Sequence, residues 1–503
     1  MSHIALEDNL YDAKSVRELD RIAIEERGIP GIVLMKRAGR AAFDELLGAW
    51  GRPQLITVFC GSGNNGGDGY IIAGLAAQQH IPVQVIELAA PEKLKGDAVL
   101  ARQFADQHAV SLKPFSECVD ISEGVVVDAL LGTGFTGEVR EPYAQAIRLI
   151  NNFSLPVLAV DIPSGLASDT GAVGNTAVNA DVTVTFIGAK QGLFTGRGPA
   201  SCGDIVYHSL DVPEDIFENV SPSSQLMDLA SLLDCLPERE ADAYKTNFGH
   251  VLVIGGDYGL GGAVMLAAEA AMRAGAGLVS VATRPEHVSA LLARRPEAMV
   301  CGVESGQVLK PLLERSTVLV VGPGLGKSAW SEQLLKEAVS ADVPIVLDAD
   351  ALNLLAEGRV IRKPDSHKWV ITPHPGEAAR LLKTTVENVQ EDRFCAVRKL
   401  EKATGAVSLL KGAGTLIVTV PGQPVSVCPY GNPGMATGGM GDVLSGLIGG
   451  LLAQGLSREN ATQLACCLHA SAADLAAEEL GQQGLLATEI LPFVRKLLNR
   501  DFL

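Results

Sequence analysis

The strongest constraint on the fold is a regular alternation between short apolar runs and longer segments with helical periodicity. Runs rich in Val, Ile and Leu recur through most of the 503 residues, after two helical segments expected at 13–26 and 32–49. Such apolar runs, separated by helices, are typical of parallel strands in a sheet covered on both faces. The expected strands are 55–60, 83–88, 125–130, 156–162 and 181–186, then 250–256, 277–283, 317–324, 343–350, 369–372, 406–412 and 415–420.

One stretch interrupts this alternation. Between residues 213 and 242 the chain turns acidic and irregular, with a single short helix expected at 227–236. A chain of this length also exceeds what one hydrophobic core supports. We therefore expect two α/β domains in series, covering residues 1–220 and 221–503.

The charge balance excludes several classes of partner. Lys and Arg number 41 against 58 Asp and Glu, a net charge of −17, so the chain should repel nucleic acid and anionic membranes. No window of about twenty residues stays apolar, and the N-terminus lacks the pattern of a targeting segment. The nine cysteines follow no paired or metal-ligand spacing, so we expect reduced, buried thiols and a cytoplasmic protein.

A glycine-rich run in the second half predicts an anion site. It spans residues 432–442 (NPGMATGGMGD) and precedes an apolar helix. Its glycines allow backbone N–H groups to approach a phosphate closely. The run ends in Asp442, which could take a proton from a substrate hydroxyl as that oxygen attacks a phosphoryl group. The alternative is that Asp442 merely caps the helix.

The first domain has a glycine loop of its own. Residues 61–70 (GSGNNGGDGY) follow an expected strand and satisfy the dinucleotide fingerprint, with Glu87 about twenty residues further on. A nicotinamide dehydrogenase is therefore one hypothesis. Against it, Asn64, Asn65 and Asp68 occupy the turn where apolar packing is expected, which indicates hydrogen bonds to a sugar or ring. A purely structural turn is the other alternative.

Two further strand ends carry polar side chains. Asp128 ends one strand, and Asp161 with Ser164 follows the next. Because ligands gather at the carboxyl ends of open α/β sheets, these residues and Asn65 could converge on one crevice. Their oxygens suit a hard cation, and Asp161 suits acid–base work. The alternative for either Asp is a cap on the next turn.

Three runs of the second domain complete the pattern. The run 322–328 (GPGLGKS) is no P-loop because Val321 stands where glycine is required, so Lys327 is expected at the surface near a helix start. His374 lies between two prolines just before a helix and should face solvent or a ligand. The run 411–415 (KGAGT), between two strands, could wrap a nucleotide's phosphates or ribose, unless it is an ordinary hairpin turn.

Together these motifs resemble two enzyme families. The C-terminal half, with NPGMATGGMGD, GPGLG, DADALN, TPHPGE and KGAGT, resembles the ADP-dependent NAD(P)HX dehydratases, which have a ribokinase-like fold. The N-terminal half, with GSGNNGGDGY, DALLGTG and DIPSG, resembles the NAD(P)HX epimerases, which have a Rossmann-like fold. The resemblance covers nearly the whole chain. It implies an N-terminal Rossmann-like domain followed by a C-terminal ribokinase-like domain.

The resemblance implies repair of hydrated nicotinamide cofactors. In NADHX and NADPHX, water has added across a ring double bond and left a hydroxyl at C6. The first domain would interconvert the R and S epimers. The second would dehydrate the S form at the expense of ADP, giving AMP and phosphate, with Asp442 deprotonating the C6 hydroxyl as it takes the phosphoryl group. Phosphate leaves more readily than hydroxide, so elimination would restore the ring.

The resemblance also assigns residues. In the epimerase half the substrate contacts fall on Asn64, Asn65, Gly66, Gly67, Asp68, Gly132, Thr133, Gly134, Phe135, Thr136, Gly137, Glu138 and Asp161, and a potassium site falls on Asn65, Asp128 and Ser164. In the dehydratase half the substrate contacts fall on Ala263, Gly324, His374 and Asp442, and the ADP contacts on Lys411, Gly412, Ala413, Gly414, Thr415 and Gly441. Mg²⁺ would be held by the phosphates of ADP or ATP.

Two other functions remain open at this point. One is a ribokinase-type small-molecule kinase fused to a binding domain, which predicts a stable phosphorylated product. The other is a non-enzymatic N-terminal module for nucleotide sensing or protein interaction. Apolar helices with Ala- and Gly-rich faces also lead us to expect a homo-oligomer.

Overall fold

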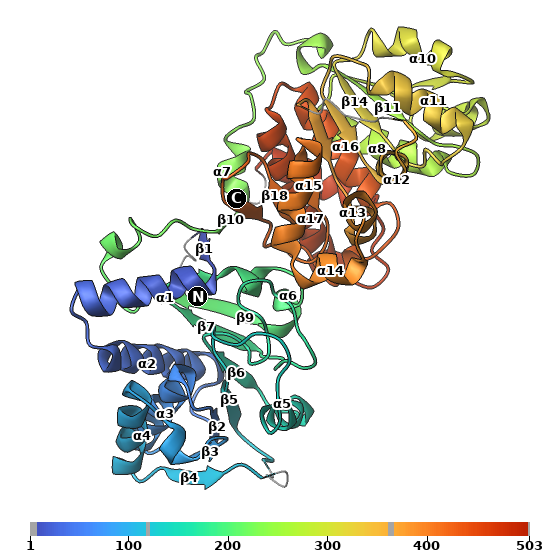
Figure 1. Cartoon of the computed structure of the whole chain (residues 1–503). Helices are drawn as coiled ribbons and strands as arrows, with labels where there is room; N and C mark the ends of the chain where they lie inside the picture. The colour runs from blue at the N-terminus through green and yellow to red at the C-terminus, as the bar shows by residue number, and fades with distance from the viewer. Residues whose placement is uncertain (1–7, 117–120, 361–366, 501–503) are drawn as a thin grey trace. The chain divides into compact units, whose positions relative to one another are not determined.

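The computed structural model describes residues 8–116, 121–360 and 367–500. It consists of two compact units, Met1–Gln225 and Leu226–Leu503 (Figure 1). Each unit is an α/β structure with its own sheet, so the expected fold class is confirmed.

The first unit is built on a seven-stranded sheet in which every neighbouring pair is parallel. The strand order is β4-β3-β2-β5-β6-β7-β9. The strands are β2 (Ile56–Cys60), β3 (Val83–Glu87), β4 (Ser111–Pro114), β5 (Val125–Ala129), β6 (Val157–Val160), β7 (Val182–Phe186) and β9 (Asp204–His208). A separate short ladder joins β1 (Asn9–Tyr11) to β8 (Ala189–Lys190) and β10 (Ser224–Leu226).

Helices cover both faces of this sheet. One face packs against α2 (Gly31–Trp50), α3 (Asn64–Gln78) and α4 (Asp97–Gln107), and the other against α5 (Tyr143–Asn152) (Figure 1). Successive side chains of β2 alternate between them, since Val58 joins the first core and Phe59 the second. The unit also contains α1 (Ala13–Arg21), a π-helical turn (Ile22–Glu26) and α6 (Gly198–Ser201).

In the second unit, strands are hydrogen-bonded side by side in the order β13-β12-β11-β14-β15-β16-β17-β18-β19. Pairing is parallel from β13 to β17 and antiparallel for the last two strands. The strands are β11 (His250–Ile254), β12 (Leu278–Thr283), β13 (Met299–Gly302), β14 (Val318–Val321), β15 (Ile345–Leu347), β16 (Trp369–Ile371), β17 (Val407–Leu410), β18 (Leu416–Val418) and β19 (Val425–Val427).

The core of this unit lies between the sheet and the helices α8 (Gly261–Arg273), α16 (Met440–Ala453) and α17 (Arg458–Leu480). Helices α8 and α16 can pack closely because Gly446 has no side chain. A Cβ at this position would lie only 2.1 Å from the carbonyl oxygen of Ala267. The other helices are α7 (Leu229–Leu233), α9 (Val288–Arg294), α10 (Gly306–Leu313), α11 (Ala329–Ala338), α12 (Ala349–Ala356), α13 (Pro375–Leu382), α14 (Val386–Glu391), α15 (Arg393–Thr404) and α18 (Leu491–Leu498).

All twelve expected strands are present, but several short strands were not predicted. The missed strands β4, β9 and β13 lie at sheet edges and carry exposed or half-buried side chains, so they lack a continuous apolar run. The expected short helix at 227–236 is α7. The helix expected at 13–26 ends its regular part at Arg21 and continues as the π-helical turn.

Two expectations from composition can be compared with the described residues. None of the helices in these residues has the length and apolar character needed to cross a bilayer. The eight cysteines in the described ranges are free, as expected, while Cys118 lies outside them. Burial was wrong for Cys235, which is exposed, because it follows the short helix α7 at the surface.

Two candidate active sites

The first site lies at the carboxyl ends of β2, β5 and β6, which are neighbours in the sheet. Each strand leads directly into one of the polar segments singled out in the sequence. The backbones meet closely: a Cβ on Gly61 would lie 1.9 Å from the carbonyl oxygen of Leu130, and one on Gly132 would lie 3.4 Å from the Cβ of Asn65. Only glycine at position 61 allows these two loops to pack together.

Asn65, Asp128 and Ser164 form a buried network at this edge. The Asp128 carboxylate accepts hydrogen bonds from the backbone N–H (2.7 Å) and hydroxyl (2.6 Å) of Ser164. Burial raises the pKa of Asp128 to about 6, although these hydrogen bonds oppose the rise. Asn65 donates its amide to Leu131 O at 3.0 Å, while its Oδ1 is buried without a hydrogen-bond partner among the described residues. An orphaned carbonyl oxygen beside a buried carboxylate fits the expected potassium site.

Asp161 does not join that network, although the sequence suggested that all four side chains could converge. Its backbone has a φ of +66°, and its side chain faces the end of β7. There Lys190 donates to its Oδ1, and the backbone N–H of Phe186 donates to the same oxygen at 3.3 Å. The turn after β6 thus divides these residues into two groups, with Ser164 bonded to Asp128 and Asp161 bonded to Lys190.

The asparagines and Asp68 were expected in a turn, and this was wrong. Helix α3 begins at Asn64 with Gly63 as its N-cap, so these residues form the first turns of the helix. Asn64 is exposed there, while Asn65 is buried and donates its amide to Leu131 O, just after β5. Asp68 is buried, and burial followed by the charge of Asp161 raises its pKa well above the ordinary value.

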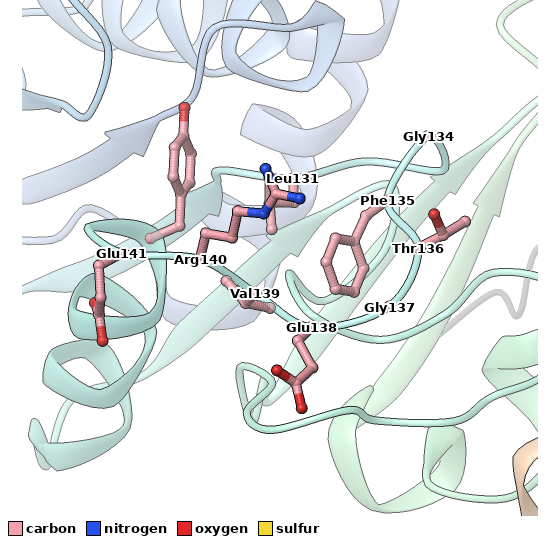
Figure 2. A pocket seen from close by; sticks show the side chains of 10 residues that line it. Leu131, Gly134, Phe135, Thr136, Gly137, Glu138, Val139, Arg140 and Glu141 are labelled. Atoms are coloured by element: carbon pink, nitrogen blue, oxygen red, sulfur yellow. The ribbon is translucent and has the colours of Figure 1, made fainter.

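The loop after β5 lines a cavity of about 870 Å³. Figure 2 shows Phe135, Glu138 and Arg140 among the side chains around it. Five of the seven residues expected to contact substrate in this loop line the cavity, namely Gly134, Phe135, Thr136, Gly137 and Glu138. Gly132 and Thr133 lie just before it. The volume is suited to part of a dinucleotide.

The dehydrogenase hypothesis depends on Glu87, and the structure argues against it. The Glu87 carboxylate accepts hydrogen bonds from the Tyr70 hydroxyl at 2.8 Å and from Arg102 at 2.7 Å. Its side chain is 9% exposed. A carboxylate held in this way is not available to a ribose hydroxyl, as the dinucleotide fingerprint requires.

The second site lies at the carboxyl ends of β14, β15, β16 and β17, which are consecutive in the sheet. Their order brings Gly324, Asp348, His374 and Lys411 to one edge. Lys411 donates to the Asp348 carboxylate at 2.8 Å. A Cβ added to Gly441, in the first turn of α16, would lie 3.2 Å from the Lys411 ammonium. The glycine-rich run and the strand ends therefore form one site.

Asp442 lies in the first turn of α16, and it does not cap the helix. The N-cap is Gly439, whose φ of +92° favours glycine and which makes no side-chain capping bond. The N-cap alternative is therefore wrong. Burial, followed by the negative charge of Asp348, raises the pKa of Asp442 to about 7, while Lys411 opposes the rise. A pKa in this range would suit a group that accepts a proton at neutral pH.

The loop 411–415 connects the antiparallel strands β17 and β18, so it is also a hairpin connection. The buried Arg393 contacts this loop. It is 1% exposed, and its guanidinium donates to the carbonyl oxygen of Lys411 at 3.3 Å. Burial lowers the pKa of Lys411, but Asp348, Glu377 and Asp442 outweigh burial and raise it. A cation is therefore fixed at the base of the loop.

His374 is the N-cap of α13 and is half exposed. Its ring Nδ1 accepts a hydrogen bond from the backbone N–H of Gly376 at 2.9 Å, and the backbone N–H of His374 donates to the Glu377 carboxylate at 2.8 Å. Burial and the nearby Lys411 lower the pKa of His374, so the neutral imidazole is favoured. Burial raises the pKa of Glu377 to about 7.

Gly324 and Ala263 approach each other from two elements. A Cβ on Gly324, whose φ is +54°, would lie 3.1 Å from the Cβ of Ala263 at the start of α8. Lys327 is exposed and pairs with Glu357, and the next residue, Ser328, caps α11. The surface position of Lys327 near a helix start is confirmed.

Sequence reasoning assigned no role to several residues that the structure places in these sites. They are Asp20 and Lys190 in the first unit, and Asp348, Glu377 and Arg393 in the second. Asp348 begins the DADALN run, so its position after a strand was a usable signal. Glu377 follows His374 by three residues, the spacing of a capping box. Asp20, Lys190 and Arg393 carry no local signal, since their partners are distant in sequence.

Comparison with known proteins identifies relatives of both units. The family described as NAD(P)H-hydrate dehydratase matches residues 251–495, and the family described as YjeF-related protein N-terminus matches residues 31–192. A bifunctional NAD(P)H-hydrate repair enzyme of Coxiella burnetii (strain RSA 493 / Nine Mile phase I) is 50% identical over 490 residues, covering 97% of this chain and 99% of the relative. The bifunctional NAD(P)H-hydrate repair enzyme of Escherichia coli (strain K12) is 39% identical over 503 residues, covering 99% and 95%.

Solved structures resemble the second unit. A ribokinase-like superfamily protein from Enterococcus faecalis V583 is 32% identical, with a TM-score of 0.51, and covers 55% of this chain and 96% of its own. The expected ribokinase-like fold of the C-terminal unit is thus confirmed.

Proposed function

The chain belongs to the bifunctional NAD(P)H-hydrate repair enzymes, and from that premise we propose which residues perform each half of the repair. The enzyme interconverts the R and S epimers of hydrated NAD(P)H and dehydrates the S form to NAD(P)H. We assign epimerisation to residues 1–220 and dehydration to residues 221–503. The S epimer that the second domain consumes is replenished from the R epimer by the first.

In the dehydratase, Asp442 is the general base. It removes the proton of the C6 hydroxyl as that oxygen attacks the terminal phosphoryl group of ADP, or of ATP, and the nucleotide loses that group. Phosphate then leaves C6 with the former hydroxyl oxygen, and a proton leaves the neighbouring ring carbon. The ring double bond is restored, and neither oxidant nor reductant is needed.

The observation that carries this proposal is the environment of Asp442. Its pKa of about 7 places it close to its ionised form at neutral pH. It lies in the first turn of a 14-residue helix, whose N-terminal N–H groups favour negative charge on a nearby phosphoryl group. Lys411 stands beside Gly441 and offers a cation to the same phosphates.

The nucleotide lies on the loop 411–415 and Gly441, and the hydrated nicotinamide lies near Ala263, Gly324 and His374. Mg²⁺ would be held chiefly by the nucleotide phosphates. Among the described residues there is no group of three or more His, Cys, Asp and Glu that could hold a metal ion. When bound, the ion would neutralise phosphate charge. Neutral His374 presents its exposed side to the substrate.

In the epimerase, Asp161 is the acid–base residue, and substrate binds along Asn64, Asn65, Gly66, Gly67 and Asp68 and the loop Gly132–Glu138. K⁺ would be held by Asn65 Oδ1 and the oxygens of Asp128 and Ser164. The orphaned Asn65 oxygen supports this site. When bound, the ion would offset the charge of Asp128 beside an anionic substrate. We also propose a homo-oligomer, which light scattering would test.

Isotope labelling tests the dehydratase chemistry. The C6 hydroxyl is labelled with heavy oxygen by hydrating NADH in labelled water, and the full chain carrying Asp161→Ala, in which epimerisation cannot exchange the label with solvent, is supplied with ADP and Mg²⁺. Phosphoryl transfer to that hydroxyl predicts one labelled oxygen in each phosphate released. Label found in water instead would refute the transfer. A phosphorylated product that accumulates without NADH would favour the small-molecule kinase alternative.

A further inference from the structure

Lys190 is a fully buried cation in the first unit. Its side chain is 1% exposed, and its ammonium donates to Asp161, to Thr185 Oγ1 at 3.1 Å and to Phe186 O at 3.1 Å. An ammonium has three protons, so these three acceptors saturate it. Lys190 has no donor left for a substrate and acts only through its partners.

The contacts of Asp161 are asymmetric. Within the described part of the chain, every hydrogen bond to its side chain falls on Oδ1, from Lys190, Phe186 and Thr185. This leaves Oδ2 for a substrate proton, and the side chain is 17% exposed. The backbone of Asp161 has a φ of +66°, a conformation that non-glycine residues adopt only when their surroundings hold them there. The ion pair is one of the contacts that hold it.

Two further carboxyl groups interact electrostatically with this pair. Asp68, in the first turns of α3, is buried with no hydrogen-bond donor to its carboxyl group among the described residues. Asp20 lies on α1, outside the residues 31–192 that match the family of this domain. Burial raises the pKa of Asp20 to about 6; Lys190 opposes this rise and Asp161 adds to it. The pKa of Asp68 is raised by burial, Asp161 and Asp20, and Lys190 again opposes the rise.

We propose that Lys190 is a positioning residue of the epimerase: it holds Asp161 as the base, with Oδ2 toward the substrate, and Asp20 and Asp68 are two further carboxyl groups whose charge acts on this pair. The buried Asp68 is then the proton donor, and Asp161 is the proton acceptor. This inference rests on the proposed role of Asp161.

The division of roles matches the chemistry of C6, which bears a hydroxyl and adjoins the ring nitrogen. Asp68 gives a proton to the departing hydroxyl, the C6–O bond breaks, and the nitrogen lone pair forms a double bond to C6. Water then adds to the opposite face, gives its proton to Asp161, and the lone pair returns to nitrogen. One water leaves and one enters, and one proton passes from Asp68 to Asp161. Return of that proton through solvent restores both groups.

The experiment measures epimerisation in the full chain. A mixture of R and S NADHX is supplied with ADP and Mg²⁺. The S fraction is consumed in a fast phase, and the R fraction in a slower phase whose rate reports the epimerase. The slow phase is followed against pH for wild type, Lys190→Met, Asp20→Asn, the double variant and Asp161→Ala. Lys14→Met, an exposed lysine on α1, is the matched control.

We expect Lys190→Met to slow the R phase by about tenfold or more near neutral pH, in keeping with the usual effect of acid–base groups. The rise of its rate on the acid side of the pH profile, the acid limb, should move to higher pH, because the ammonium beside the Asp161 carboxyl group is lost. Asp20→Asn should move the limb to lower pH, and the double variant should return toward wild type. Lys14→Met should leave rate and profile unchanged.

If Lys190 served folding alone, Lys190→Met would lower the amplitude or the rate of the R phase, but the acid limb of its pH profile would not move. An unshifted limb in both Lys190→Met and Asp20→Asn overturns the inference. Should Lys190→Met fail to fold, Asp20→Asn alone decides, since its side chain is only partly buried. If Asp161→Ala keeps the wild-type R phase, the proposed function of this site fails, whereas loss of that phase with unshifted limbs refutes only the inference.

Discussion

Replacing Asp442 with Asn should make the dehydratase inactive and more stable at the same time. Asn has nearly the same shape as Asp, but it cannot accept a proton from the C6 hydroxyl. General base catalysis contributes about 10²- to 10⁴-fold, or about 3–5 kcal/mol of the barrier, so dehydration should fall by at least that lower factor. The stability gain follows from the cost of ionising Asp442 in the folded state.

The magnitude of that cost can be worked from the pKa of Asp442. Its rise from 3.8 to about 7 corresponds to about 4 kcal/mol at about 1.36 kcal/mol per pKa unit. Part of the side chain reaches solvent, so we expect about half of this, or about 2 kcal/mol. Burial is the first cause of the rise and Asp348 the second, and both penalise the charged form.

The sign of the pH dependence follows from linkage. Because the folded-state pKa lies above the ordinary value of 3.8, the folded state binds this proton more tightly than the unfolded chain. That contribution to stability is fully present below pH 3.8 and is lost as the pH rises to about 7. Asn carries no such proton, so the variant's advantage should be about 2 kcal/mol near pH 8 and about 1 kcal/mol or less near pH 5.

Calorimetry of both proteins at these two pH values measures the effect. For a domain of this size, about 2 kcal/mol raises the Tm of the C-terminal unit by roughly 5 °C. The Tm of the N-terminal unit should not change. If Asp442→Asn is inactive but has the wild-type Tm at both pH values, ionising Asp442 does not destabilise the folded state. A variant that retains dehydratase activity would remove it as the base.

Three other outcomes follow from the same geometry. The dehydratase rate of the wild type should rise through about pH 7, because Asp442 must be ionised, and a rate independent of pH between about 5.5 and 8 would contradict this. Gly441→Ala should raise the KM for ADP about tenfold, since its Cβ would lie 3.2 Å from the Lys411 ammonium; Gly438→Ala, whose Cβ meets nothing within 4 Å, should have a smaller effect, and equal KM values would refute the steric argument. Asp128→Asn should abolish any stimulation of epimerisation by K⁺ over Na⁺, and a retained stimulation in steady-state rates would place the ion elsewhere.

Most of the fold could be predicted because its signal is local. Each interior strand is a continuous apolar run, and each loop that follows carries glycine and polar residues in a short segment. The edge strands β4 and β13 escaped because their side chains are partly exposed and their pairing partners are far along the chain. These segments form strands because they pair with the neighbouring strand of the folded sheet, and a local sequence pattern does not show that pairing.

The sites show the same division. Asp442, His374 and the loop 411–415 lie in recognisable motifs, so the sequence could single them out as candidate site residues. The partners that tune them could not. Lys190 meets Asp161 across 29 residues, and Lys411 meets Asp348 across 63, so each ion pair exists only through the order of strands in the sheet.

The central claim is that one chain repairs both epimers with two separate acid–base residues, Asp442 and Asp161. The most direct test adds the full chain, ADP and Mg²⁺ to a mixture of R and S NADHX and follows the near-ultraviolet absorbance of the dihydronicotinamide ring. Wild type should restore all of the NADH, Asp161→Ala should stop near the S fraction, and Asp442→Ala should restore none. If wild type stops at the S fraction, or if Asp442→Ala restores NADH at the wild-type rate, the account is contradicted.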